Sequence, residues 1–149
     1  MIVIFEGADA SGKDVVREAF ERLTKYQHTC VTRFTFSQAV FARYFKRTQW
    51  TNRRKREQII HEAQELVATF SPLVVYCHAV PRVLRYRYGA RGEDYAAQPD
   101  SVVLHQYYVE LFEHLRLGDH LYDVDTSACP DLEDLASGIA KRIRQIKGE

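Results

Sequence analysis

The sequence has no long hydrophobic run and almost no excess of charge. Its first hydrophobic run, at residues 2–5, already ends at Glu6, which is too short for the hydrophobic region of a signal peptide. No run approaches the roughly 20 residues that a membrane-spanning helix needs, so we expect no membrane partner. The formal net charge is only +1, which excludes a strong overall attraction to nucleic acid.

Cysteine is scarce as well. Cys30, Cys77 and Cys129 are odd in number and far apart, so neither a disulfide framework nor the ligand spacing of a metal site can be recognised. We expect incidental thiols in a reducing cytoplasm. The sequence contains no internal repeat, linker or low-complexity segment. A length of 149 residues fits a single domain, over residues 1–149, with a sizeable core.

What the sequence does contain is a glycine-rich segment between a hydrophobic run and a helical pattern. It reads Gly7-Ala8-Asp9-Ala10-Ser11-Gly12-Lys13-Asp14. A strand, a glycine-rich turn and a helix in this order are the context of a phosphate-binding loop. The glycines let backbone N–H groups point inward at phosphate oxygens, the start of the helix adds its positive dipole end, and Lys13 adds a mobile cation. The segment therefore predicts binding of a nucleoside triphosphate.

One position of this loop departs from the usual pattern. The residue after the lysine is normally Ser or Thr, whose hydroxyl holds Mg²⁺, and here it is Asp14. A carboxylate is also a hard-oxygen ligand, so Asp14 is the candidate Mg²⁺ ligand. Its negative charge should weaken phosphate binding unless a metal offsets it. The alternative explanation is that the pattern arose by chance or has decayed.

Hydrophobic spacing predicts strands that alternate with helices along the rest of the chain. Strands are expected at residues 2–5, 29–34, 73–77 and 120–125. Helices are expected at 13–25, after an N-cap at Ser37, along Ile59, Ala63, Leu66 and Phe70, from Pro81, across 104–115 and across 132–146. This alternation predicts an α/β, three-layer fold of the P-loop NTPase type, with a mostly parallel sheet and helices on both faces.

Three segments together resemble a known family. Residues 5–13, Phe-Glu-Gly-Ala-Asp-Ala-Ser-Gly-Lys, are close to F-E-G-x-D-G-S-G-K, the one motif that is specific by itself. Residues 32–41 resemble D-R-x-x-x-S-x-x-x-Y, with Arg33 and Ser37 at matching spacing. Residues 73–94 are similar to a strand, an x-P-x-x-x-L-x-x-R helix and an R-G lid. The chain thus resembles a short, phage-type member of the thymidylate kinase–like P-loop kinases.

The resemblance implies an enzyme that moves the γ-phosphate of ATP, with Mg²⁺, to a deoxynucleoside monophosphate such as dTMP or a modified pyrimidine nucleotide. It implies that Lys13 contacts the donor phosphates and that Asp9 contacts the acceptor sugar. Arg87 and Arg91 resemble lid arginines that close over the transferring group, in a lid at about residues 87–98. A homodimer is suggested by the family alone. A phage-encoded chain would act in the host cytoplasm.

Each of these residues also has a plainer interpretation. Arg33 is predicted at the carboxyl edge of the sheet, where α/β folds bind ligands, and its guanidinium could grip the acceptor phosphate with two hydrogen bonds; otherwise it is a surface arginine. Ser37 is either a substrate contact or, preferably, an N-cap. Asp9 could be a turn residue. Arg87 and Arg91 could be an exposed basic helix end.

Two departures from the family keep other functions open. Thr32 stands where the family has Asp, and a hydroxyl acceptor needs a general base whereas a phosphate acceptor does not, so a monophosphate acceptor is favoured. In an alternative alignment with the family, Thr32-Arg33 would correspond to its T-R-E motif and the chain would lack the D-R segment; we prefer the first alignment. The basic stretch at 46–56, with Trp50, motivates a kinase that acts on a modified pyrimidine in DNA, the less favoured partner. Asp14 and Thr32 motivate a non-catalytic nucleotide-binding regulator.

Overall fold

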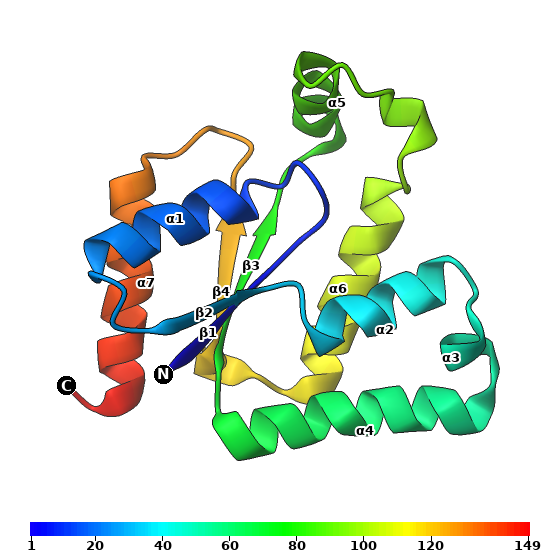
Figure 1. Ribbon diagram of the computed structural model, residues 1–149, viewed down its shortest axis with the longest axis horizontal. Helices are drawn as coiled ribbons and strands as arrows, with labels where there is room; N and C mark the ends of the chain where they lie inside the picture. The colour runs from blue at the N-terminus through cyan, green and yellow to red at the C-terminus, as the bar shows by residue number, and fades with distance from the viewer.

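The computed structural model describes residues 1–149 as a four-stranded parallel sheet with helices on both faces (Figure 1). The strands are β1 (Ile2–Glu6), β2 (Thr29–Thr32), β3 (Leu73–His78) and β4 (Leu121–Asp125). The helices are α1 (Lys13–Leu23), α2 (Thr35–Tyr44), α3 (Thr48–Thr51), α4 (Arg53–Phe70), α5 (Pro81–Ala90), α6 (Ser101–Leu115) and α7 (Leu132–Lys147). The predicted α/β fold is confirmed. No helix is both long and hydrophobic enough to cross a bilayer.

The strand order is β2-β1-β3-β4, so β1 lies in the interior of the sheet between β2 and β3. All pairs are parallel, and Ile4 lies opposite Val31 on one side and Val74 on the other. Because the strands are parallel, their carboxyl ends meet at one edge, which is where open α/β sheets bind ligands. The loops that follow β1, β2, β3 and β4 therefore gather at this edge.

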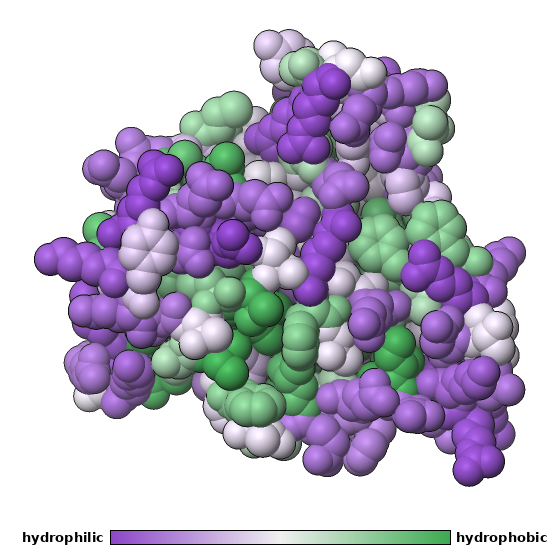
Figure 2. All heavy atoms as spheres, in the orientation of Figure 1, coloured by the Kyte–Doolittle hydropathy of each residue, from purple (hydrophilic) through white to green (hydrophobic).

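Alternation along the strands sends side chains into two separate cores. Helices α1 and α7 cover one face and α2, α4 and α6 cover the other (Figure 1). The first core contains Val3, Phe5, Val16, Phe20, Leu73, Val75, Ile139 and Ile143. The second contains Ile4, Phe36, Val40, Val74, Tyr76, Leu104, Tyr108 and Phe112. Figure 2 shows hydrophobic side chains gathered near the middle of one face, over the sheet, between hydrophilic helices.

The structure corrects three details of the sequence prediction. Ser37 is not an N-cap: α2 begins at Thr35, after Phe34 as its cap, and Ser37 is buried inside its first turns. Strand β2 ends at Thr32 because Arg33 takes a positive φ of 51°. Phe70, the last residue of α4, is 57% exposed and belongs to neither core, whereas Ile59 and Ala63 of the same helix are buried.

Candidate functional site

The loop of residues 7–12 curls over the carboxyl ends of β1 and β3. Gly7 has φ 147°, and a Cβ there would lie 2.3 Å from the carbonyl oxygen of Cys77, so no other residue fits. Gly12 has φ 89° and is the N-cap of α1, which has no side-chain cap. Ala10 also has a positive φ, 61°. The first N–H groups of α1 thus have no capping side chain, as an anion site at a helix N-terminus requires.

Lys13 folds back across this loop. Its side chain is only 5% exposed, and Nζ lies 3.3 Å from the Ala8 carbonyl oxygen and 3.9 Å from Oδ1 of Asp9. Burial, followed by the charge of Arg33, lowers the pKa of Lys13. The negative charge of a polyphosphate beside Nζ would oppose this shift and favour the charged ammonium.

Asp14 lies exposed in the first turn of α1, and its charge acts on Lys13 to raise the lysine pKa. No group of three or more His, Cys, Asp or Glu side chains forms a metal site in the protein. Mg²⁺ is usually held by one or two carboxylates together with substrate phosphates and water. A single exposed carboxylate next to the loop fits that mode of binding, and the remaining ligands would have to come from the nucleotide.

Asp9 and Arg33 meet at the edge of the sheet. Arg33 follows β2, its N–H donates to the Phe5 carbonyl oxygen at 3.1 Å, and its guanidinium forms an ion pair with the Asp9 carboxylate. The guanidinium carbon also lies 5.6 Å from the ring centre of Phe41 on α2. This geometry places Arg33 beside the loop.

Glu6 is a buried carboxylate beside the loop that was not among the predicted site residues. It ends β1, is completely buried, and accepts a hydrogen bond from the Phe34 N–H at 3.0 Å. The hydroxyl of Tyr108 donates to its other oxygen at 3.5 Å. Burial raises the pKa of Glu6 to about 7, although the N–H groups of Phe34 and Ser37 oppose the shift. The signal in the sequence is a lone carboxylate at the end of a buried strand.

Ser37 supports the same turn. Its hydroxyl donates to the Phe34 carbonyl oxygen at 2.9 Å and its backbone N–H bonds to Glu6. Together, Glu6 and Ser37 fix the turn that carries Arg33. Because the hydroxyl proton of Ser37 is already donated to the Phe34 carbonyl oxygen, this side chain stabilises the turn.

Arg87 ties α5 to the loop. Its Nη1 donates to the Ala10 carbonyl oxygen at 2.8 Å and to Oγ1 of Thr126 at 2.9 Å, and its Nη2 donates to the Thr126 carbonyl oxygen at 2.7 Å. Thr126 in turn donates to the Ser11 carbonyl oxygen at 2.6 Å. Thr126 was not anticipated from the sequence. These bonds join the loop, α5 and the segment after β4 into one unit.

Arg91 is different from Arg87. It caps the C-terminal end of α5, is exposed, and its side chain makes no ion pair or hydrogen bond. A spacing of four residues suggests one helix face for both arginines, yet only Arg87 reaches the loop. The two side chains therefore have separate roles: Arg87 is fixed and Arg91 is free.

Cavities of very different size flank the loop. One of about 490 Å³ lies between Ala10 and Gly12, the second half of α5, and residues 126–135; Val15, Tyr86, Arg87, Arg91, Pro130 and Leu132 are among its lining residues. This volume suits a nucleoside. On the Asp9 side, a cavity of only about 20 Å³ lies among Phe41, Tyr88 and Tyr95. The Ser11 hydroxyl is buried in the loop without a partner.

Comparisons with known proteins give one curated relative and one solved structure, and no family model matches the chain. The SPbeta prophage-derived uncharacterized protein YorR of Bacillus subtilis (strain 168) is 28% identical over 116 residues, which are 78% of this chain and 66% of that protein. The alignment thus spans about two thirds of the relative's length. The crystal structure of YorR from Bacillus subtilis in complex with phosphorylated GDP covers 100% of this chain and 99% of its own, at 22% identity and a TM-score of 0.69. This chain thus shares the α/β fold of YorR, a parallel sheet flanked by helices.

Proposed function

We propose that this protein is a nucleotide kinase that binds ATP and Mg²⁺ at loop 7–14 and transfers the γ-phosphate to a deoxynucleoside monophosphate, dTMP or a modified pyrimidine nucleotide. The observation that carries the proposal is the loop itself, with a buried Lys13 folded across it and the uncapped start of α1 beneath it. The phosphorylated GDP bound to YorR supports nucleotide binding by this fold. The family resemblance implies ATP as the phosphate donor, and GTP should be tested beside it.

The donor nucleotide belongs on the side of α5 and α7. The base and ribose fill the cavity of about 490 Å³, and the triphosphate follows the loop toward Lys13. Arg87 and Thr126 hold the loop in its curled shape through their hydrogen bonds. Arg91, exposed at the end of α5, swings toward the γ-phosphate when the lid at residues 87–98 closes, which also excludes water.

The acceptor belongs on the side of Asp9 and Arg33. Its phosphate takes the place of the Asp9 carboxylate on the Arg33 guanidinium, and Asp9 turns to the acceptor sugar. Phe41, Tyr88 and Tyr95 then form the walls for the base. The cavity there is about 20 Å³, far below the size of a ligand pocket, so the segment that joins α5 to α6 first opens to admit the acceptor and then closes as part of the lid.

The chemistry needs charge neutralisation more than acid–base catalysis. An ionised oxygen of the acceptor phosphate attacks the γ-phosphorus, the bond to the oxygen that bridges the β- and γ-phosphates breaks, and ADP leaves with its electrons. Lys13 and Arg91 balance the negative charge of the transferring group. Glu6 is not the base, because its carboxylate is completely buried and already bonded to Phe34 and Tyr108. Mg²⁺ beside Asp14 would offset further phosphate charge.

The test is phosphoryl transfer from γ-labelled ATP or GTP to a panel of acceptors with Mg²⁺. The panel contains the four deoxynucleoside monophosphates, 5-hydroxymethyl-dUMP, thymidine, and DNA with and without hydroxymethylated pyrimidine. We expect the wild-type protein to form labelled diphosphate product from one or more monophosphates, and the Lys13→Ala protein to form far less. The matched control is Lys55→Ala, at an exposed position on α4. Nucleotide binding without transfer would instead identify a regulator, and labelling of DNA alone would identify a DNA kinase.

A further inference from the structure

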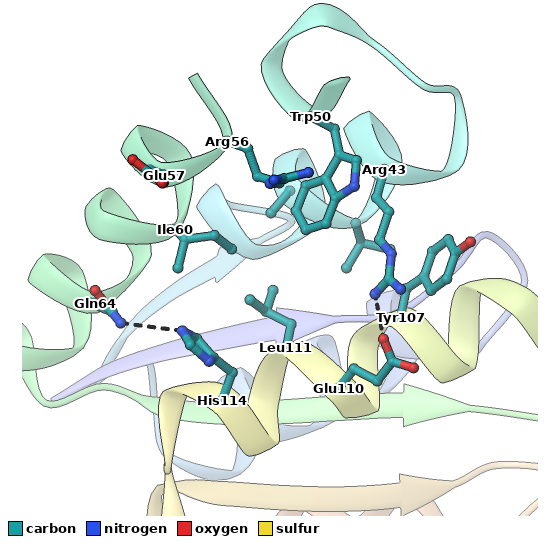
Figure 3. Close-up of a pocket in the computed structure, with 12 residues that line it drawn as sticks. Arg43, Trp50, Arg56, Glu57, Ile60, Gln64, Tyr107, Glu110, Leu111 and His114 are labelled. Atoms are coloured by element: carbon teal, nitrogen blue, oxygen red, sulfur yellow. Dashed lines mark hydrogen bonds and ion pairs between the residues drawn. The ribbon is translucent and has the colours of Figure 1, made fainter. Parts of the chain in front are cut away.

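A second, larger pocket lies on the opposite side of α2 from the Arg33–Phe41 contact. It has a volume of about 580 Å³ and lies between α2, α3, α4 and α6 (Figure 3). None of its lining residues belongs to loop 7–14 or to the ion pair beside it. Ile60 and Leu111 form a hydrophobic floor, and the indole of Trp50 hangs over them (Figure 3). The pocket therefore has the apolar body that small-molecule sites share.

One arginine of this pocket is fully committed to the fold. Arg43 forms an ion pair with Glu110, and its guanidinium lies 3.8 Å from the ring centre of Tyr107 and 5.4 Å from that of Trp50. The bonds from Arg43 and Gln106 hold the pKa of Glu110 below its usual range. Both oxygens of Glu110 are thus occupied, and Arg43 is neutralised.

A second arginine has no such partner. Arg56 is half-buried at the pocket wall, 5.7 Å from the ring centre of Trp50, and its guanidinium makes no ion pair or hydrogen bond. The nearby carboxylate of Glu57 is paired with Arg53 instead, at 3.0 Å. After these pairs are formed, one positive charge remains over the hydrophobic floor. A ligand that satisfies it must carry an anion next to a flat apolar body.

Opposite Trp50, the pocket wall carries hydrogen-bonding side chains that could bind the edge of a nucleobase. The Gln64 amide on α4 faces the His114 imidazole on α6, and the two nitrogens are 3.4 Å apart (Figure 3). This contact is long, and neither side chain makes another hydrogen bond. A glutamine amide presents a donor and an acceptor side by side, as is needed to bind a nucleobase edge with two hydrogen bonds.

We propose that this pocket is a second nucleotide site, for a free nucleoside monophosphate. The base lies between Trp50, Ile60 and Leu111 with its edge on Gln64 and His114, and the phosphate binds Arg56. The volume of about 580 Å³ is in the range of ligand pockets. The inference gives a role to Trp50 and to the basic stretch at 46–56, and it does not depend on catalysis at loop 7–14.

Trp50 makes the test specific, because it is the only tryptophan of the chain, which has nine tyrosines. Selective excitation of tryptophan in the full-length Arg33→Gln protein, titrated with dAMP, dCMP, dGMP or dTMP, reports on this pocket after the arginine proposed to bind the acceptor phosphate has been removed; Arg33 does not line the pocket. We expect a saturable change in fluorescence with one or more of them, and none with inorganic phosphate or with the matching nucleoside at the same concentration.

Arg56→Gln is expected to raise the Kd of this fluorescence change at least about tenfold, because it removes a charge-assisted hydrogen bond. Arg54→Gln is the matched control: this arginine is exposed on the same helix, does not line the pocket, and should leave the Kd unchanged. Gln64→Ala should reduce the preference among bases and retain the phosphate requirement. Wild-type-like thermal unfolding of each variant checks the fold.

Three results would overturn the proposal. The first is a fluorescence that none of the four monophosphates changes, and the second is an equal effect of Arg54→Gln and Arg56→Gln. The third is quenching by single-stranded oligonucleotides at far lower concentrations than by any monophosphate, which would identify a nucleic-acid surface. Phosphoryl transfer by the wild-type protein is measured separately, so failure at this pocket and failure of the proposed kinase activity are distinguishable.

Discussion

The two sides of the loop that follows β1 are built differently. On the α5 and α7 side, Arg87 is held by hydrogen bonds to Ala10 and Thr126, next to a cavity of about 490 Å³. On the α2 side, Arg33 is paired with Asp9 next to a cavity of about 20 Å³. The α5 and α7 side is rigid and has an open cavity. The α2 side is closed, and a ligand there must replace the ion pair between Arg33 and Asp9. We therefore expect the base and ribose of the donor to enter an existing cavity, and the acceptor phosphate to bind only when the Asp9–Arg33 pair opens.

Removal of Lys13 should have the largest effect, because this side chain lies across the loop between the two sides. Lys13→Ala is expected to lower kcat/KM by about 10²- to 10³-fold, the usual loss when one preorganised charge donor is removed. Steady-state transfer from γ-labelled ATP measures the change. Lys55→Ala is the control for the loss of one lysine. A Lys13→Ala protein with near-normal turnover would end the interpretation of this loop as a catalytic element.

The next largest effect should come from Glu6, which supports the closed side from beneath. Its pKa is raised from 4.5 to about 7 by burial, so between these pH values the folded protein keeps a proton that the unfolded chain has lost. The contribution of this group to stability is therefore complete below pH 4.5 and is lost as the pH rises through about 7. A shift of this size corresponds to about 3 kcal/mol.

The measurement is the free energy of unfolding of wild type and Glu6→Gln in urea across that pH range. The amide can still accept from Phe34 and reach Tyr108, and it does not titrate. The difference in unfolding free energy, wild type minus variant, should decline with rising pH by about 3 kcal/mol. Asp14→Asn, which changes an exposed carboxylate, is the control. A difference that stays flat, or rises with pH, contradicts the assignment.

A pair of conservative substitutions compares the two sides directly. Arg33→Lys keeps the charge but loses the planar fork, so we expect it to raise the KM of the acceptor about tenfold and to leave donor binding unchanged. Arg87→Lys loses part of its bonding to Ala10 and Thr126, and should weaken donor binding by a similar factor. Initial rates with each substrate varied in turn give both constants. If both variants alter the same constant, the loop does not separate two substrate sites.

Local patterns made the fold and the loop predictable from sequence. The strands at 2–5 and 73–77 are hydrophobic throughout, as buried parallel strands are, and the structure has them at Ile2–Glu6 and Leu73–His78. Gly7 and Gly12 could be interpreted because only the backbone freedom of glycine allows the curl. Arg33 could be placed because the end of a strand determines the edge of the sheet at which it lies.

The side chains that brace the loop could not be found in this way. Thr126 reaches the Ser11 carbonyl oxygen, and Tyr108 reaches Glu6, over sequence separations of 115 and 102 residues. Such contacts depend on how α6 and the segment after β4 pack, and no local periodicity encodes that. Arg91 was grouped with Arg87 because the two resemble lid arginines, but α5 ends at Ala90 and only Arg87 forms hydrogen bonds to the loop.

The smallest expected effect concerns Ser37, where a contact with substrate and a structural bond predict different results. Its hydroxyl donates to the Phe34 carbonyl oxygen at 2.9 Å, in the turn that carries Arg33, and it is only 6% exposed. Ser37→Ala should therefore lower the free energy of unfolding by about 1 kcal/mol, the usual value of one hydrogen bond, and leave both KM values unchanged. Thr35→Ala, at the start of the same helix, is the control for a lost hydroxyl. A Ser37→Ala protein with wild-type stability and a raised acceptor KM would contradict this. It would show that the substrate reaches this hydroxyl, which requires the turn beneath Arg33 to move together with the lid.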